Sequence, residues 1–549
     1  MTTAFTLPLR TKAAHWLWTI PALLLHAQPP TQAASENPTD LFEGRVVPRL
    51  QIDVPPEGMA VLKDYRQVWG KPRPERKDVH VTVQAGNTLL TNVALHLKGS
   101  FTFQPIDGKP SLTLNFDKFV RGQRFYGLDK IHLNNSVQDP SFLCEKLARE
   151  AFAEAGVPAT RIAHARVILN GRDLGLYVLV EAYNKHFLKQ HFESTKGNLY
   201  DGGSGGDISK ALEVDSGDNP TDRSDLTALL AATRLTNPTQ RLARLEQLLD
   251  VDRFLTFTAL EVLFQHWDGY CLGPNNYRLF HDYPQDKLVF MPHGLDQILG
   301  VGQSPAPTIT PHWDGLVAKA LFTTAAGRRR YLERLQNIFT NQFQAERLIG
   351  KVDQMSERLH AAAGNVVARS QFDTAVQNLK ARITRRVAQV ARQLEHPERP
   401  LTFDQDGYAR LPTWQFHGGR SPMASNRTKV DDHDTLEIRA GDSWSSASWR
   451  TLVLLPAGHY QLLGQGRTLG IPASATNSGV MLRISGERSP SGLTTNTDWT
   501  PLRYDFDVQD LINVELVCEF RGADGRGVFD AGSLRLRRSG SAKPVSEPR

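Results

Sequence analysis

The fold is decided by the stretch Gln265-His266-Trp267-Asp268-Gly269-Tyr270, which ends an apolar helical run. Two amides, Asn275 and Asn276, follow the acid of this stretch by seven and eight residues. A second acid, Asp296, comes after two short apolar runs that predict a β-hairpin. Carboxylate and amide oxygens that converge across a hairpin can hold Mg²⁺ and a phosphate together. We therefore expect a metal and phosphate site here.

The chain before this stretch has the alternating apolar pattern of β-strands. The predicted strands are 47–54, 79–83, 93–97, 111–116, 130–134, 165–169 and 175–181. The last two are separated by Asn170-Gly171, a dipeptide typical of tight hairpin turns.

One helix is predicted within this strand-rich region, at residues 139–155. Asp139 is a favourable N-cap, Pro140 suits the first helical position, and Gly156 follows the last turn. Apolar residues cover more than one face, so we expect the helix to be packed on two sides. Glu145 lies four residues before Arg149, and the two can form an ion pair.

From about residue 183 onward the pattern is mostly helical. Helices are predicted at 225–249 and 252–266, and residues 329–395 show a long 3.6-residue periodicity. Strands followed by helices predict an α+β fold with two lobes and a cleft between them.

Near residues 395–400 the composition changes again, and residues 402–540 are rich in short strands, Gly and Ser. The predicted strands include 451–455, 459–463, 479–484, 513–518 and 532–536. This spacing predicts an all-β sandwich of jelly-roll type. Four tryptophans could stack on sugar rings if they line one face, and burial of at least half of them is the alternative; they are Trp414, Trp444, Trp449 and Trp499.

Both ends of the chain read as segments outside the folded regions. Residues 1–27 have the basic start and apolar run of a signal peptide, with cleavage after Ala27 or near Ala33-Ala34, and a retained anchor is the alternative. Residues 28–44 are predicted to be a flexible leader and 541–549 a disordered tail. No later apolar run reaches the roughly 20 residues of a membrane span. We expect a protein secreted to the periplasm or cell surface, with no span in the mature chain.

Composition excludes some classes of partner and scaffold. The net charge is +6, from 64 basic and 58 acidic residues, and no basic block is dense enough to predict nucleic-acid binding. The three cysteines are too few for a disulfide scaffold, and none has zinc-site spacing.

Over residues 45–395 the sequence resembles the CotH (spore coat protein H) family of secreted, atypical protein-kinase-like proteins. The motifs that carry the resemblance are, in chain order, Leu97-Lys98-Gly99-Ser100, Lys109-Pro110, Leu114-Asn115-Phe116, Leu133-Asn134-Asn135, Asp139-Pro140, Asn170-Gly171, Gly175-Leu176-Tyr177, Val180-Glu181, Asn198-Leu199-Tyr200, Trp267-Asp268-Gly269-Tyr270, Asn276-Tyr277 and Leu295-Asp296. Their order makes the match specific.

The resemblance implies a kinase-like domain, with an N-lobe at about 45–182, a C-lobe at about 183–395 and ATP with Mg²⁺, or Mn²⁺, in the cleft. It implies that Asp268 orients or deprotonates the acceptor hydroxyl. Asn276, or Asn275, would hold metal, and Asp296 would bind the Mg²⁺ that bridges the phosphates. Helix capping by Asp268 and a turn at the two amides are the structural alternatives.

The resemblance also implies a Lys that neutralises the phosphates and a helix Glu that orients it. Glu145 is the candidate Glu, with pairing to Arg149 as the alternative. Lys109 is the favoured Lys and Lys98 the second, since the family's usual Lys before Phe116 is replaced by Asn115. Glu181 is expected to meet the adenine or ribose, or else to cap its strand.

One departure concerns the family's Trp-Asp-x-Asp motif, which reads His293-Gly294-Leu295-Asp296 here. The resemblance implies phosphoryl transfer from ATP to protein Ser or Thr. The replacement of an acid by Gly294 favours the alternative, a catalytically degenerate kinase fold that acts as an extracytoplasmic scaffold. In either case the sandwich is expected to bind polysaccharide or a surface.

Overall fold

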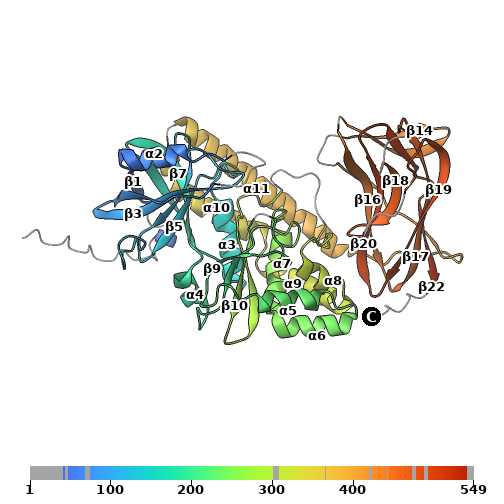
Figure 1. Cartoon of the computed structure of the whole chain (residues 1–549), viewed down its shortest axis with the longest axis horizontal. Helices are drawn as coiled ribbons and strands as arrows, with labels where there is room; N and C mark the ends of the chain where they lie inside the picture. The colour runs from blue at the N-terminus through green and yellow to red at the C-terminus, as the bar shows by residue number, and fades with distance from the viewer. Residues whose placement is uncertain are drawn as a thin grey trace, which may run out of the picture.

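A computed structural model describes residues 41–540, apart from 44–46, 68–73, 204, 301–307, 365, 419–422, 442, 473–477 and 488–491. The predicted signal peptide, tail and most of the leader lie outside the described residues. Leu41 and Phe42, at the end of the predicted leader, are buried in the first apolar core, so the leader prediction does not hold for them. The chain mixes helices and strands, as predicted, in three successive regions (Figure 1).

The first region is a closed barrel of seven strands in the order β1-β2-β3-β4-β5-β7-β6. Its strands are β1 (Arg49–Asp53), β2 (Val79–Ala85), β3 (Thr88–Lys98), β4 (Ser111–Asn115), β5 (Lys130–Asn134), β6 (Ile162–Leu169) and β7 (Arg172–Glu181). All seven strand predictions are confirmed. β1 closes the barrel by pairing antiparallel with β2 and parallel with β6. Alternate residues of β2 are buried in the barrel interior, as the period of two predicts.

Two helices accompany the barrel. The helix α2 (Pro56–Asp64), which was not predicted, packs beside β2. The helix α3 (Cys144–Glu154) packs between the barrel and the helices that follow, and it is buried on more than one face as predicted. It begins at Cys144 and not at Asp139, because Phe142 has a φ of +60°, which no right-handed helix allows. The Asp139 carboxylate instead accepts hydrogen bonds from the backbone N–H groups of Ser141 and Cys144.

The second region surrounds a four-stranded sheet in the order β11-β10-β8-β9. Its strands are β8 (Leu199–Asp201), β9 (Glu213–Ser216), β10 (Tyr277–Asp282) and β11 (Lys287–Pro292). The helices are α4 (Lys185–His191), α5 (Ser224–Thr233), α6 (Pro238–Leu248), α7 (Val251–Leu263), α8 (Leu316–Phe322), α9 (Ala325–Asn341), α10 (Ala345–His360) and α11 (Val366–Glu395), with the 3₁₀ turn η1 (Ala361–Ala363) before the last. The predicted hairpin after Asn276 is therefore confirmed as β10 and β11.

The structure divides the single helix predicted at 225–249 into α5 and α6. Asn237 caps the second of these helices by accepting hydrogen bonds from the N–H groups of Thr239 and Gln240. Pro238 at its first position cannot continue the preceding helix, since proline removes a donor and clashes with the previous turn.

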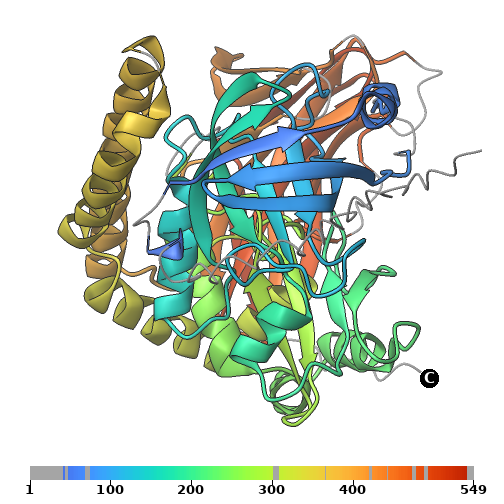
Figure 2. The same ribbon diagram turned by 90° about the vertical axis from the view of Figure 1, so that its left-hand side faces the viewer.

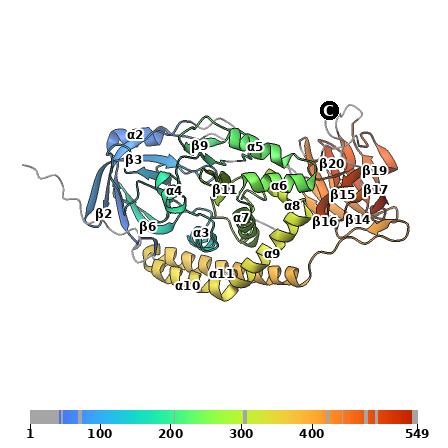
Figure 3. The ribbon, with the colours of Figure 1, turned by 90° about the horizontal axis from the view of Figure 1, so that it is seen from below.

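The helix α11 is the longest of the described elements and runs from beside the barrel, along the helical region, toward the sandwich (Figures 1 and 3). Its 30 residues give a length of about 45 Å. Figure 2 shows α10 and α11, in yellow and gold, standing together at one side of the molecule. A buried arginine of α11, Arg386, donates to the carbonyl oxygens of Val262 (2.7 Å) and Leu263 (3.1 Å) at the end of α7.

The third region consists of two facing sheets that enclose one apolar core. One sheet has the order β12-β22-β17-β21-β15-β14, with β19 also paired to β17, and the other has the order β13-β16-β20-β18. The strands are β12 (Tyr408–Arg410), β13 (Gln415–His417), β14 (Ala424–Val430), β15 (His433–Arg439), β16 (Ser445–Leu455), β17 (Gly458–Leu469), β18 (Gly479–Ile484), β19 (Thr497–Val508), β20 (Ile512–Gly522), β21 (Arg526–Asp530) and β22 (Arg535–Gly540). Four of the five predicted strands lie within strands of the structure; in the fifth, 532–536, only the last two residues do.

The four tryptophans do not form one sugar-binding face. Trp414 and Trp449 are buried in the core of the sandwich. Trp499 lies under the guanidinium of Arg467 (4.9 Å), and Trp444 is exposed in the segment before β16. Burial of half of these side chains was the alternative stated from sequence, and it holds.

The sandwich contacts the helical region through polar groups. Asp510 Oδ2 accepts a hydrogen bond of 2.6 Å from the first N–H of α9, at Ala325. Arg328 donates to Asn513 Oδ1 at 3.0 Å. These bonds attach the start of β20, an inner strand of the four-stranded sheet, to the start of α9.

Candidate active site

The loop after α7 is held by a buried carboxylate. Glu261 has no solvent exposure, and its two oxygens accept hydrogen bonds of 2.9 Å from the N–H groups of Tyr270 and Cys271. Gly269 lies against the same group, since a Cβ there would come within 2.4 Å of Glu261 Oε1. The chain therefore turns back on the helix end at the very residues that surround Asp268.

A buried histidine connects this loop to the segment after β11. His266 Nε2 donates to the carbonyl oxygen of Gly294 at 2.9 Å, and its Nδ1 lies 3.5 Å from Glu261 Oε1. Because a carbonyl oxygen can only accept, Nε2 carries the proton. The end of α7 is thereby fixed to the segment that follows β11.

Asp268 is brought together with both amides, as the sequence predicted. Asn275 Nδ2 donates to Asp268 Oδ1 at 2.9 Å, and Asn276 Nδ2 donates to Oδ2 at 2.7 Å and to the backbone oxygen at 2.9 Å. The backbone of Asn276 has a φ of +48°, which turns its amide toward the acid. With each amide nitrogen occupied by Asp268, the amide oxygens of Asn275 and Asn276 remain as acceptors for other groups.

The second acid, Asp296, lies half-buried two residues beyond Gly294. Burial, together with the negative charges of Glu145 and Asp139, raises the pKa of its carboxyl to about 7. A carboxylate in this position is short of positive partners. Asp296, Glu145 and Asp139 therefore form an anionic side of the site that can attract a cation.

Glu145 is placed on α3 with its carboxylate facing this region. Its Oε2 is buried without a hydrogen-bond partner and lies 3.7 Å from Arg149 Nε, which is also buried without one. The pairing with Arg149 that was the alternative from sequence is thus present as an ion pair, although not as a hydrogen bond. Arg149 Nη1 donates mainly to Thr160 Oγ1, at 2.7 Å.

The two candidate lysines occupy different surroundings. Lys98, at the end of β3, donates to Asn134 Oδ1 at 2.7 Å. Burial lowers the pKa of Lys98 to about 8, and the opposing influence is the charge of Glu145. The ammonium group of Lys109 lies over the rings of Phe142 (4.7 Å) and Tyr177 (5.1 Å), and burial lowers its pKa to about 8 as well. Of the two lysines, Lys98 is the one whose pKa is raised by the nearby charge of Glu145.

The carboxylate of Glu181, at the end of β7, is hydrogen-bonded to Arg161. Its oxygens accept hydrogen bonds from Arg161 Nη2 (2.6 Å), Nε (2.9 Å) and the backbone N–H (3.0 Å). The carboxylate is 2% exposed. This geometry corresponds to the strand-end role that was the alternative for this residue.

Sequence reasoning missed Arg278, on β10 two residues after Asn276. Its Nη1 lies 2.6 Å from Asp201 Oδ1, and its Nε lies 3.4 Å from Asp215 Oδ2. The pKa of His293 is held well below its usual value by burial, and then by the charges of Arg278, Arg149 and Lys98. These cations therefore meet near the start of the Asp296 segment. The signal in the sequence was a charged residue among the buried Tyr277, Leu279 and Phe280 of the same strand.

Gly205, from the glycine-rich stretch after β8, lies beside Asn275. The N–H of Gly205 donates to Asn275 Oδ1 at 3.3 Å. Asp207 is turned away from this contact, since its carboxylate accepts from the N–H of Leu316 (2.8 Å) and from the hydroxyl of Tyr270 (3.2 Å). Asp207 therefore anchors α8 and is not available to a ligand.

The oxygen atoms of this site suit a metal ion whose other ligands come from a bound substrate and water. Within the described parts of the chain, no group of three or more His, Cys, Asp or Glu side chains is arranged to hold a metal ion. Mg²⁺ is usually bound by one or two carboxylates together with substrate phosphates and water, so a complete protein cage is not needed. The underpaired Asp296 and the amide oxygen of Asn276 are donors of the required kind.

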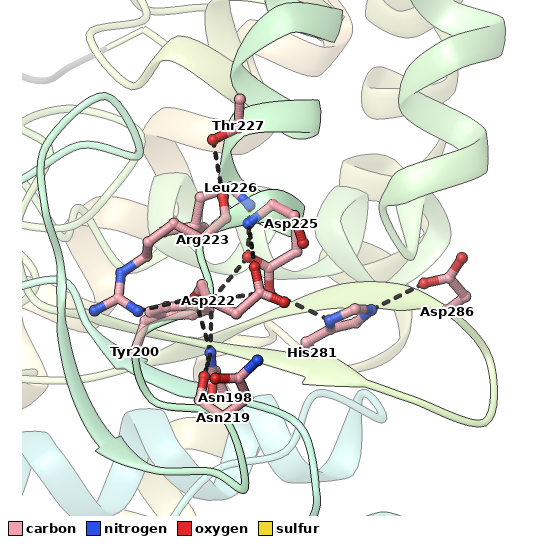
Figure 4. A network of polar contacts seen from close by, with 11 residues as sticks. Asn198, Tyr200, Asn219, Asp222, Arg223, Asp225, Leu226, Thr227, His281 and Asp286 are labelled. Carbon is pink, nitrogen blue, oxygen red and sulfur yellow. Dashed lines mark hydrogen bonds and ion pairs between the residues drawn. The ribbon is translucent and has the colours of Figure 1, made fainter.

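A second polar network ties the sheet to α5 and involves none of the site residues above (Figure 4). Tyr200 donates to both oxygens of Asp225, at 2.7 and 2.9 Å. His281 lies between Asp225 Oδ2 (3.2 Å) and Asp286 Oδ1 (2.9 Å). Asn198 donates to the backbone oxygens of Asn219 and Asp222. The network therefore fixes β8 and β10 relative to the segment that precedes α5.

Comparison with known proteins places the site within a recognised family. A family model described as "CotH kinase protein" matches residues 95–394, which include Lys98, Glu145, Asp268 and Asp296. No helix in the described parts of the chain combines the length and apolar character that crossing a bilayer requires.

Three similar proteins illustrate the range of the match. "Invasin CotH3" of Rhizopus delemar is 28% identical over 189 residues, covering 31% of this chain and 31% of that protein. "Inner spore coat protein H" of Bacillus subtilis is 21% identical over 258 residues, covering 44% of this chain and 70% of that protein. The solved structure of the Helicobacter pylori proinflammatory kinase CtkA aligns with 61% of this chain and 98% of its own, with 10% identity and a TM-score of 0.27. The chain thus spans about a third of the length of the invasin it matches.

Proposed function

The chain belongs to the CotH kinase protein family, and on that premise we propose that it transfers the terminal phosphoryl group of ATP to a serine or threonine hydroxyl of a protein. The observation that carries this proposal is the fixed position of Asp268, whose two carboxylate oxygens are held by Asn275 and Asn276. Phosphoryl transfer depends mainly on positioning and charge neutralisation, and an acid held in one orientation suits the first of these needs.

In this proposal the barrel is the N-lobe, residues 183–395 form the C-lobe, and ATP lies between them. Asp268 accepts the proton of the attacking hydroxyl. Asn276 and Asp296 would hold Mg²⁺, or Mn²⁺, which when bound neutralises charge on the phosphates. The orphaned Glu145 oxygen and the underpaired Asp296 favour a cationic ligand on this side.

We assign the phosphate-neutralising role to Lys98, although Lys109 was favoured from sequence. Lys98 responds to the charge of Glu145, the residue expected to orient it, whereas Lys109 lies on two aromatic rings. Arg278 adds a second cation near His293. Because Arg161 occupies the Glu181 carboxylate, adenine would be recognised by backbone groups at the end of β7.

Nucleotide binding and phosphoryl transfer by the full chain test this proposal. Calorimetric titration with ATP and Mg²⁺ or Mn²⁺ should show binding, and γ-labelled ATP should label the protein itself or a dephosphorylated casein. Asp268→Asn should abolish labelling while ATP binding remains, and Asp296→Asn should weaken metal-dependent binding at least tenfold. Asp524→Asn, an exposed acid in the turn between β20 and β21, is the matched control. If the wild type binds no nucleotide, or labels no better than Asp268→Asn, the enzymatic proposal is lost.

A second candidate function belongs to the sandwich, where a cleft of about 380 Å³ lies on the four-stranded sheet β13-β16-β20-β18. Its wall is polar and includes His417, Ser446, Ser448, Arg450 and Glu519. Hydroxyl-rich ligands such as polysaccharides suit such a wall. Retention of the full chain on insoluble polysaccharide, lost in Arg450→Ala and kept in the sandwich control Arg410→Ala, would support binding here. Equal retention of all three forms would contradict it.

Export of the protein by residues 1–27 is also a proposal, carried by the sequence alone. Sequencing the N-terminus of the protein recovered from outside the cytoplasm tests it. A chain that keeps residues 1–27 and stays inside the cell would contradict it.

A further inference from the structure

A large cavity lies at the far end of the β10–β11 hairpin from Asp268. It has a volume of about 640 Å³ and is bordered by the end of α4, the junction of α6 and α7, and the hairpin turn. From Tyr277, next to the site amides, to Asp282 in this cavity is five residue steps, or about 17 Å along the strand. The cavity is therefore separate from the proposed phosphoryl-transfer site.

Carboxylates dominate the charge of its wall. Five acids line it, against three cations, Arg253, Lys287 and Arg330. Three of the acids have partners within the wall, as shown by Arg330 at 2.6 Å from Glu246 and 3.5 Å from Asp252, and by Arg253 at 3.4 Å from Asp250. The other two acids are Glu193 and Asp282. Over the described part of the chain, neither has a side-chain hydrogen bond or an ion pair, so the wall has unbalanced negative charge.

Asp282 is the unusual member of this wall. It is only 9% exposed, and its Oδ1 is fully buried without a hydrogen-bond partner. An acceptor that loses water without gaining a donor is costly to the folded protein. Burial raises the pKa of Asp282, and the charges of Glu193 and Asp250 raise it further, against the opposing charge of Arg253. A ligand that brings positive charge beside this carboxylate would offset the repulsion from Glu193 and Asp250.

The chemistry of the wall selects one class of cation. The cavity is much larger than one metal ion, and no metal-ligand group is found among the described residues. Phe192, Leu249, Val251 and Pro284 also line it, so an alkyl stem can be buried beside the charged head. Ammonium and guanidinium groups carry only donors, which is what an unpartnered carboxylate oxygen requires.

We propose that this cavity binds an alkylammonium or guanidinium group, with Asp282 and Glu193 as the residues that recognise the charge. The group can come from a Lys or Arg side chain of a polypeptide or from a free polyamine. The site stands on its own geometry and does not require that the chain transfers phosphate.

Titration calorimetry on the full chain without nucleotide tests the site with two probes, spermidine and a Lys-Gly repeat decapeptide. Binding of either probe to the wild type, weakened at least tenfold in Asp282→Asn and in Glu193→Gln, supports the proposal, and the tighter probe identifies the source. Asp286→Asn removes the same charge four residues away, from an 86% exposed side chain outside the cavity wall, and should bind like wild type. A Gln-Gly repeat decapeptide should not bind.

Binding of neither probe, or equal binding to the wild type and both cavity variants, overturns the proposal. Calcium binding that is lost in Asp282→Asn, with no probe binding, overturns it in favour of a metal. Thermal unfolding provides a second readout, because Asp282→Asn removes an uncompensated carboxylate and should not lower Tm. If that variant nevertheless fails to fold, Glu193→Gln alone decides between these outcomes, since among the described residues the Glu193 side chain has no hydrogen-bond or ion-pair partner that folding could lose.

Discussion

Asn276 and Gly294 lie so close together that a Cβ on Gly294 would come within 2.4 Å of Asn276 Oδ1. Gly294 also has a φ of +56°, which side chains disfavour. The family's usual acid at this position would therefore displace the amide that holds Asp268. The glycine is part of how this site is built, and its presence does not by itself indicate a degenerate enzyme.

Gly294→Ala and Gly294→Asp should both lower the free energy of unfolding, by about 1–3 kcal/mol, because strain and a steric clash add together. Gly86→Ala is a close control, since Gly86 has a φ of +55° but no atom within 4 Å of the added Cβ. Urea unfolding of the three variants separates the clash from the strain. Equal losses at positions 86 and 294 would show that Asn276 moves aside freely.

Arg386→Met should lower the free energy of unfolding by about 2–3 kcal/mol, since two carbonyl oxygens at the end of α7 lose a charged donor. Burial lowers the pKa of Arg386 to about 10, which reflects how completely water is excluded there. Arg385→Met removes an exposed neighbour and should change stability by less than about 0.5 kcal/mol. Chemical denaturation measures both, and similar values would contradict a role for Arg386 in fixing the loop before Asp268.

Contacts between residues close in sequence could be predicted, whereas contacts between distant residues could not. The contact between Asp268 and the Asn276 amide could be predicted from sequence because the two residues are only eight positions apart, on either side of a tight loop. The contact of Arg386 with Val262 spans 124 positions. Its signal was a charged residue on the buried stripe of α11, beside Leu379, Ile383 and Val390.

Closure of the seven strands into a barrel was not predictable, because the alternating pattern shows which residues face inward but not which strands pair. The parallel pairing of β1 with β6 joins segments more than 100 residues apart. The start of α3 was misplaced for a local reason. Asp139 and Pro140 are typical of a helix start, but the left-handed backbone of Phe142 delays the helix to Cys144.

His281 predicts a pH dependence of stability. Asp225 and Asp286 flank its ring and raise its pKa above the ordinary value of 6.5, against the lowering effect of burial. Because the folded pKa is raised, the stabilisation is complete below the unfolded pKa and is lost as pH rises through the folded one. His281→Gln should therefore lower Tm more at pH 5.5 than at pH 9. Thermal unfolding at both pH values, with His186→Gln as the control, measures the effect, and an equal loss at both would contradict it.

Lys98→Met should weaken ATP binding at least tenfold, whereas Lys109→Met should weaken it less than threefold. The reason is that Lys98 is the lysine that responds to the charge of Glu145, while Lys109 is held over the rings of Phe142 and Tyr177. Lys118→Met, at an exposed lysine paired with Asp78, controls for the loss of one charge from the barrel. Calorimetric titration with ATP and Mg²⁺ compares the three variants. A larger loss in Lys109→Met would return the phosphate-neutralising role to that residue, and no loss in either would place the nucleotide phosphates away from this end of the barrel.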